Sequence, residues 1–156
     1  MLELSSLDLG EIAAALQDQT VDDYRWLIDP ESGQLSVWTE DGGIDGHTSV
    51  DLDDVDLLPI EPLPPWVWYQ DMVDFTEGIS DERAGHALAR AIQGKGAFRR
   101  FADRLHQDYP QLLPAWHAFR AARAERRALQ WLADNSLIDD QAAARALTHH
   151  PDPTLP

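Results

Sequence analysis

Hydrophobic residues recur at helical spacing near the start of the chain. Ile12 and Leu16 are four residues apart and share one face of a helix that the pattern predicts over residues 6–18. Ser5 precedes this pattern, and Asp8 stands three residues after Ser5, as in a capping box at the start of a helix. The first predicted element is therefore an amphipathic helix.

Two short runs with strand character come next. Residues 24–29 and 34–39 are rich in aromatic and branched residues, and the Pro30-Glu31-Ser32-Gly33 segment between them suits a tight turn. This pattern predicts a β-hairpin. The following residues, 40–58, combine glycines with many carboxylates and are typical of an acidic loop, with a third strand as an option at residues 57–60.

Five later segments have helical patterns. Pro65 is well placed in the first turn of a helix whose circumference is mostly apolar, so that helix is expected to be central. Ser80 precedes two acidic residues and is a good N-cap for the next helix. The predicted helices span residues 65–77, 80–94, 97–109, 113–134 and 139–147.

These elements predict an α+β fold in a single domain over residues 1–148. A small antiparallel sheet of two or three strands, from residues 24–60, is expected to pack on a bundle of four to five helices. A chain of 156 residues is long enough to bury about two thirds of the surface that its unfolded form exposes. Residues 149–156 are expected to form a flexible tail.

The net charge of −16 is distributed unevenly along the chain. Residues 1–82 contain 21 acidic residues and one basic residue, Arg25, whereas residues 83–156 contain 7 acidic and 11 basic residues. Two interpretations are open. The opposite charges pair within the fold or keep the protein in solution, or the basic half forms a surface that binds phosphate or an acidic partner.

The turn between the helices predicted at 80–94 and 97–109 has unusual chemistry. Two glycines flank a lysine, so backbone N–H groups can approach an anion where the helix dipole adds about half a positive charge. We therefore predict an anion- or partner-binding site at this turn. The alternative is that the glycines only permit a sharp turn while the arginines pair with the acidic half. The residues of the predicted site are Gly94, Lys95, Gly96, Arg99 and Arg100.

Three arginines extend this predicted site. Arg120, Arg123 and Arg127 share an outer face of the helix predicted at 113–134, with Trp116 on the same side. Cationic and aromatic side chains on one face are used against nucleic acid. A solvated face, or an ion-pair partner for the acidic loop, is the alternative interpretation.

No pattern in the sequence predicts a metal, a cofactor or a catalytic nucleophile. The six histidines have no metal-binding spacing, and there is no cysteine. The acidic loop fails as a calcium loop because Leu52 stands where a bidentate glutamate is required. Its carboxylates, such as Asp53 and Asp54, are expected to be solvated or, as a minor alternative, to imitate nucleic-acid phosphates. Gly96 occupies the position of the Ser or Thr of a Walker A loop, so that motif is also absent.

Membrane insertion and secretion are not expected. The first residues are acidic and lack the basic segment of a secretory signal. No apolar run approaches the roughly 20 residues that span a bilayer. The sequence therefore predicts a cytoplasmic protein.

The sequence resembles an uncharacterised bacterial family, number zero-one-five-eight of the UPF series. The likeness runs from about Leu7 to Leu132, and residues 137–156 are expected to lie beyond the usual end of the family. The family has no established activity, so the resemblance implies one coherent domain and assigns no catalytic residue. The segments that carry it are Gly94-Lys95-Gly96-Ala97-Phe98-Arg99-Arg100-Phe101, Trp116-His117-Ala118-Phe119-Arg120, Trp131-Leu132, Leu27-Ile28-Asp29, Ser32-Gly33 and Met72-Val73-Asp74-Phe75.

Three functional hypotheses follow. The preferred one is a non-enzymatic binding or adaptor protein that holds an unknown protein partner at the Gly94–Arg100 turn and the adjacent arginine face. The alternative is an RNA or nucleotide-phosphate binding protein, whose affinity would fall steeply with salt. The third is a small acid/base enzyme, which needs a pocket near residues such as Asp71, Asp74 or His86. The oligomeric state is left open.

Overall fold

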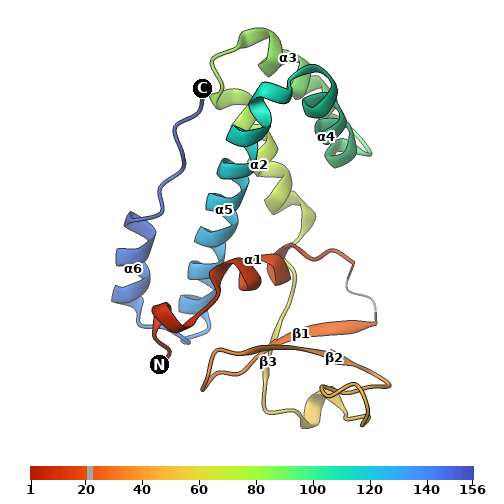
Figure 1. Ribbon diagram of the computed structural model, residues 1–156, viewed down its shortest axis with the longest axis vertical. Coiled ribbons are helices and arrows are strands. Elements are labelled where there is room, and N and C mark those ends of the chain that lie inside the picture. Colours follow the sequence, from red (N-terminus) through yellow and green to blue (C-terminus); the bar gives the residue numbers. More distant parts are fainter. Residues whose placement is uncertain (21–22) are drawn as a thin grey trace. The chain divides into compact units, whose positions relative to one another are not determined.

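The computed structural model describes residues 1–20 and 23–156 (Figure 1). Contacts divide the chain into two compact units. Unit 1 comprises Met1–Leu63 and Ala124–His150, and unit 2 comprises Pro64–Arg123 and Pro151–Pro156. The longest helix, α5 (Leu113–Asp134), contributes its first half to unit 2 and its second half to unit 1.

Unit 1 begins with a short 3-10 turn, Leu4–Ser6, followed by helix α1 (Leu9–Gln17). The N-cap of α1 is Asp8, whose side chain accepts a hydrogen bond from the backbone N–H of Glu11 at 3.0 Å. The predicted N-cap, Ser5, instead lies within the 3-10 turn, so this detail of the prediction is wrong. A carboxylate at this position also complements the positive end of the helix dipole.

The sheet of unit 1 has three antiparallel strands in the order β2-β1-β3. The central strand β1 (Tyr24–Ile28) pairs with β2 (Leu35–Thr39) and β3 (Leu58–Ile60), so the predicted hairpin and the optional third strand are confirmed. Leu27 and Ile28 are both fully buried although they point to opposite faces of the sheet. Both faces are therefore covered at this end of β1.

One carboxylate links α1 to the sheet. Asp18 accepts hydrogen bonds from the hydroxyl group of Tyr24 at 2.5 Å and from Nε1 of Trp26 at 2.9 Å, as well as from both donors of Thr20. The hydrogen bonds from Thr20, Trp26 and Tyr24 hold the pKa of Asp18 well below its ordinary value. The end of α1 is thereby tied to the start of β1.

The acidic loop uses some of its carboxylates to order its own backbone. Asp45 accepts from the backbone N–H groups of His47 and Thr48, both at 2.8 Å, which lowers its pKa. Asp51 accepts from the N–H of Asp53 at the start of a 3-10 turn. These contacts are the local side-chain turns that Asp residues favour in loops.

The second half of α5 and helix α6 (Asp140–Thr148) complete unit 1. Asp139 caps α6, as the sequence predicts, through a 3.3 Å hydrogen bond from the N–H of Ala142. The buried apolar residues of this unit come from α1, the sheet, α5 and the segment around α6. They include Ile12, Leu16, Leu27, Ile28, Ile60, Leu129, Leu132, Ile138 and Ala143.

Unit 2 is helical. It contains α2 (Pro65–Gly78), α3 (Glu82–Ala91), α4 (Ala97–Asp108) and the first half of α5. The predicted bounds of these helices agree with the structure to within a few residues, and Pro65 opens α2 as expected. The N-cap of α3 is Asp81, which accepts from the N–H of Ala84 at 3.1 Å, and not the predicted Ser80.

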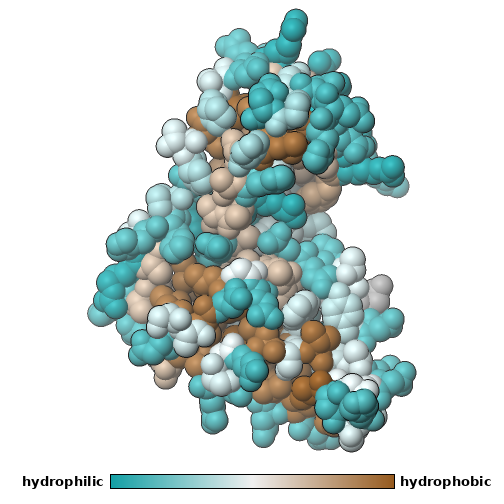
Figure 2. All heavy atoms as spheres, in the orientation of Figure 1, coloured by the Kyte–Doolittle hydropathy of each residue, from teal (hydrophilic) through white to brown (hydrophobic). Residues whose placement is uncertain are grey.

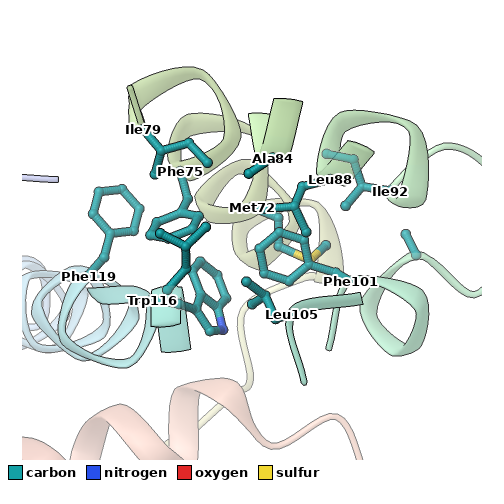
Figure 3. Close-up of a cluster of buried hydrophobic side chains, with 12 residues drawn as sticks. Met72, Phe75, Ile79, Ala84, Leu88, Ile92, Phe101, Leu105, Trp116 and Phe119 are labelled. Atoms are coloured by element: carbon teal, nitrogen blue, oxygen red, sulfur yellow. The ribbon is translucent and has the colours of Figure 1, made fainter. Parts of the chain in front are cut away.

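An aromatic cluster forms the core of unit 2 (Figure 3). Phe75 of α2 meets Trp116 and Phe119 of α5 at centroid distances of 5.2 and 5.8 Å, and Phe101 of α4 at 6.3 Å. Trp116 is only 8% exposed. Trp116 lies on the same side of α5 as Arg120, since both line one pocket. Its indole fills this core and is not exposed on an outer face, so that part of the expectation is wrong.

The described residues contain six α-helices and one three-stranded antiparallel sheet, which confirms the predicted α+β class. Within the same residues, no helix combines the length and apolarity that crossing a bilayer requires. On the face drawn in Figure 2, hydrophilic residues cover most of the region of α3 and α4, and hydrophobic residues reach the surface near α1 and the strands.

Candidate functional site

The turn between α3 and α4 is built on two glycines in the left-handed conformation. Gly94 and Gly96 have φ values of 76° and 77°, which side chains with a Cβ rarely adopt. Gly96 is the N-cap residue of α4 and has no side chain with which to cap it. The glycines are thus explained by the geometry of the turn, and the same geometry leaves the side chain of Lys95 exposed.

Arg100 folds back onto this turn from the first turn of α4. Its Nε donates to the carbonyl of Ala91 at 2.8 Å, and its terminal nitrogens donate to the carbonyls of Gln93 and Lys95, with a longer contact of 3.4 Å to Gly94. The carbonyl of Ala91 is at the end of α3, where backbone acceptors have no partner within the helix, and the other carbonyls lie in the turn that follows. Arg100 therefore caps α3, a role that the sequence pattern did not reveal.

A groove of about 450 Å³ lies between α3 and α4. Three arginines line it together with one carboxylate, so its charge is positive in a chain whose net charge is −16. Arg100 is part of the predicted site, whereas Arg90 and Arg104 were not predicted. Their spacing offered a signal, because Arg104 is one helical turn after Arg100. The lining residues are Arg90, Ala91, Arg100, Asp103, Arg104 and Gln107.

The cations around this groove differ in their partners. Arg104 donates to Asp108 at 2.8 Å, and this hydrogen bond raises its pKa. Arg99 lies 4.0 Å from Asp103, with 90% of its side chain exposed. Among the residues that the structure describes, no carboxylate lies within ion-pair distance of Arg90 or Lys95. These two cations are accordingly available to an external anion.

The predicted arginine face of α5 is divided between the two units. Arg120 and Arg123 belong to unit 2, and Arg127 belongs to unit 1. Arg123 is engaged by carboxylates from both halves of the sequence, with Nη1 at 2.7 Å from Asp74 and two hydrogen bonds of 2.9 and 3.0 Å to Asp152. This arrangement fits the interpretation in which some acidic and basic residues pair within the fold.

Neighbouring carboxylates stabilise the charged form of the Arg123 side chain. Burial disfavours the charged guanidinium, but the hydrogen bonds of Asp152 and Asp74 outweigh this and raise the pKa of Arg123. The buried carboxylate of Asp71 lies 3.5 Å from Nη1, and the ring of Phe119 lies 4.7 Å from the central carbon of the guanidinium. Arg123 is therefore held in one orientation from several sides.

A smaller pocket of about 140 Å³ lies between α2, α4 and α5. Asp71, which is 1% exposed, and Arg120 line it beside apolar and aromatic side chains. A single carboxylate in such a pocket does not define an acid/base pair, so the enzyme hypothesis stays a prediction. The remaining lining residues are Trp68, Met72, Phe98, Phe101, Ala102 and Trp116.

Comparison with known proteins relates the chain to proteins without an assigned activity. The sequence profile described as "Uncharacterised protein family (UPF0158)" matches residues 15–149. A relative named UPF0158 protein PA5073, from Pseudomonas aeruginosa, is 31% identical over 140 residues, which cover 90% of this chain and 88% of that protein. The match reaches residue 149, so the expectation that residues 137–149 lie beyond the family is wrong. No solved structure matches the chain.

Proposed function

The chain belongs to the uncharacterised protein family UPF0158, and we propose that it is a non-enzymatic binding or adaptor protein. Its ligand in this proposal is an acidic segment of a partner protein, which binds in the groove between α3 and α4. The Gly94–Gly96 turn forms the rim of the site and contributes Lys95. The cytoplasmic location expected from the sequence stays part of this proposal.

The observation that carries the proposal is the composition of the groove. Arg90, Arg100 and Arg104 line it with a single carboxylate, Asp103, although the chain as a whole is strongly acidic. A local positive surface on an acidic protein favours ligands whose negative charge is localised. The acidic remainder of the protein repels extended polyanions. Carboxylate side chains suit arginines especially well because they accept paired hydrogen bonds.

The predicted residues contribute unequally to this proposed site. Lys95 and Arg90 supply charge that no neighbouring carboxylate neutralises within residues 1–20 and 23–156. Arg100 contributes charge to the groove but directs most of its donors to the end of α3. We therefore expect Arg90 and Lys95 to contribute most to affinity, Arg104 to contribute less because it is paired with Asp108, and Arg100 to hold the shape of the turn.

The alternative ligand, RNA or another phosphate compound, would use the same cations. Two observations favour the protein ligand. Of the described residues that line the groove, none is aromatic, whereas binding of single strands commonly relies on stacking. The net charge of −16 also opposes binding to a polyanion.

A direct test compares two labelled probes of equal charge, a glutamate-rich peptide and a single-stranded RNA, by fluorescence anisotropy. We expect the peptide to bind more tightly than the RNA. The pair of substitutions Arg90→Ala and Lys95→Ala should weaken peptide binding about tenfold, or about 1.4 kcal/mol. Arg145→Ala, an exposed arginine of unit 1, is the matched control and should leave affinity unchanged.

Two results would contradict the proposal. The first is RNA binding that is tighter than peptide binding and falls steeply with salt, which would establish the phosphate-binding alternative. The second is undiminished peptide binding by the doubly substituted variant, once its thermal melting has shown that it is folded.

A further inference from the structure

The last residues of the chain belong to unit 2 and are held there at three points. Asp152 forms two hydrogen bonds with Arg123, Leu155 packs against the aromatic core, and the carbonyl of Pro156 accepts from the N–H of Ser80 at 2.8 Å. Figure 1 shows this extended segment ending beside the junction of α2 and α3. Residues 151–156, named here the terminal segment, thus occupy a defined site on helical unit 2.

The place of Leu155 is shaped by a glycine. A Cβ atom added to Gly78 would lie 2.5 Å from Cδ1 of Leu155, closer than two carbon atoms can approach. Gly78 ends α2 with no positive φ, so its lack of a side chain serves the close approach of Leu155 and not an unusual backbone conformation. The surface of α2 therefore has a recess that a leucine side chain fills.

The place of Asp152 is prepared by a preoriented arginine. Arg123 has 21% of its side chain exposed. It is held in place by an ion pair with Asp74 at 2.7 Å and by a cation–π contact with the ring of Phe119. Its two remaining nitrogens face Asp152 in the paired geometry that guanidinium groups use to bind carboxylates. These supports do not involve the terminal segment, so the carboxylate receptor is built into α2 and α5.

The terminal segment itself has the properties of an exchangeable ligand. Its residues belong to no helix or strand, and three of its six residues are proline, which reduces the conformational entropy lost on docking. Between the two anchors, the side chain of Thr154 is exposed. The recognised pattern is therefore a carboxylate followed, three residues later, by a leucine.

We propose that the site formed by Gly78, Ser80 and Arg123 is a peptide-docking site that also accepts an Asp-x-x-Leu segment of a partner protein. The chain's own terminal segment occupies the site and lowers the apparent affinity for the partner by competition. This site is distinct from the groove between α3 and α4, and the inference does not depend on the function proposed for that groove.

The test uses the full chain and a labelled peptide with the sequence of residues 149–156. The paired substitutions Asp152→Asn and Leu155→Ala weaken docking of the chain's own segment. We expect the peptide to bind this variant at least about tenfold more tightly than it binds the unsubstituted protein, because the competitor has been weakened. Thr154→Ala is the matched control and should bind as the unsubstituted protein does.

A third substitution checks the location of the site. Gly78→Leu, added to the paired variant, fills the recess where the leucine of the peptide must lie, and Leu is well tolerated in a helix. Peptide binding should fall by at least about tenfold. A paired variant that melts cooperatively but does not bind the peptide would overturn the proposal, as would binding that Gly78→Leu leaves unchanged.

A second experiment does not depend on the folding of the paired variant. The chain has no cysteine, so Thr154→Cys provides a unique position for a dye on the terminal segment. Added unlabelled peptide should displace the segment and lower the anisotropy of the dye in a saturable manner. A peptide with Asn and Ala at the two anchor positions should not do so. An anisotropy unaffected by the native peptide would overturn the proposal.

Discussion

The Nε atom of Arg100 donates to the carbonyl oxygen of Ala91 across 2.8 Å, so the first turn of α4 caps the last turn of α3. Two neighbouring arginines thereby have different environments. Arg100 is directed to backbone carbonyls, whereas Arg99 is 90% exposed and only 4.0 Å from Asp103. The sequence suggested equal roles in anion binding for both, and this contrast makes them a natural pair for comparison.

Replacing Arg100 is expected to cost stability, whereas replacing Arg99 is not. Arg100→Ala leaves the carbonyls at the end of α3 without their donor, and we expect the free energy of unfolding to fall by about 1–2 kcal/mol. Arg99→Ala removes a solvent-exposed ion pair and should change it by less than about 0.5 kcal/mol. Urea denaturation measures both values, and equal losses would contradict the capping role of Arg100.

Substitution of either glycine of the turn should destabilise the protein more than substitution at an ordinary surface position does. Gly94→Ala and Gly96→Ala place a Cβ on a residue with φ near 76°, which costs about 1–2 kcal/mol. Gly94→Asn should cost less because Asn tolerates this conformation. At Gly96 the added Cβ would also lie 3.1 Å from Nη1 of Arg100, whereas at Gly94 there is open space.

These substitutions are compared by thermal denaturation, with the shift in melting temperature converted to a change in unfolding free energy. We expect Gly96→Ala to cost most and Gly94→Asn to cost least. Gly46→Ala is a control for conformation alone, because Gly46 has a positive φ and nothing within 4 Å of the added Cβ. If Gly96→Ala were no more destabilising than Gly46→Ala, the contact with Arg100 would have no energetic weight.

Sequence analysis could predict where the helices and strands begin and end, because these limits depend on residues that are close together in the sequence. The hairpin and the helices starting at Pro65 and Leu113 are fixed by hydrophobic periodicity and by Pro and Gly signals. The choice of N-cap was not accessible in the same way. Ser80 and Asp81 are both good caps, and Asp81 takes the position while the N–H of Ser80 is bound to Pro156, a residue distant in sequence.

The candidate site was only partly accessible for the same reason. The sequence identified Lys95 and its neighbours from glycine spacing and charge. It did not show that Arg100 turns back onto α3, or that Arg123 is engaged by Asp74 and Asp152, because the partners are brought together by packing between helices. The burial of Trp116 likewise follows from its place among Phe75 and Phe101.

The link between α1 and β1 should make stability depend on pH. Hydrogen bonds from Thr20, Trp26 and Tyr24 lower the pKa of Asp18 in the folded protein below the ordinary value of 3.8. The stabilisation is therefore complete above that value, decreases as the pH falls below it, and is lost once the pH passes the folded pKa. At neutral pH, Asp18→Asn should lower the free energy of unfolding by about 1–2 kcal/mol.

The measurement is the difference in unfolding free energy between the unsubstituted protein and Asp18→Asn at several pH values. This difference should shrink as the pH is lowered below 3.8. Asp53→Asn, in the exposed acidic loop, is the control and should show little difference at any pH. A difference that stays constant, or grows, in acid would mean that the charge of Asp18 is not what stabilises the junction.

The prediction of a single domain over residues 1–148 can be tested through the core of unit 2. Phe75→Ala removes the ring at the centre of the aromatic cluster and should cost about 3–5 kcal/mol. Since the continuous helix α5 contributes to both units, we expect cooperative unfolding, in which the substitution also reduces protection in unit 1. Hydrogen exchange at the backbone amides of the central strand β1, such as Leu27, reports on this. Faster exchange confined to α2, α3 and α4, with β1 unaffected, would show instead that the two units unfold as independent domains.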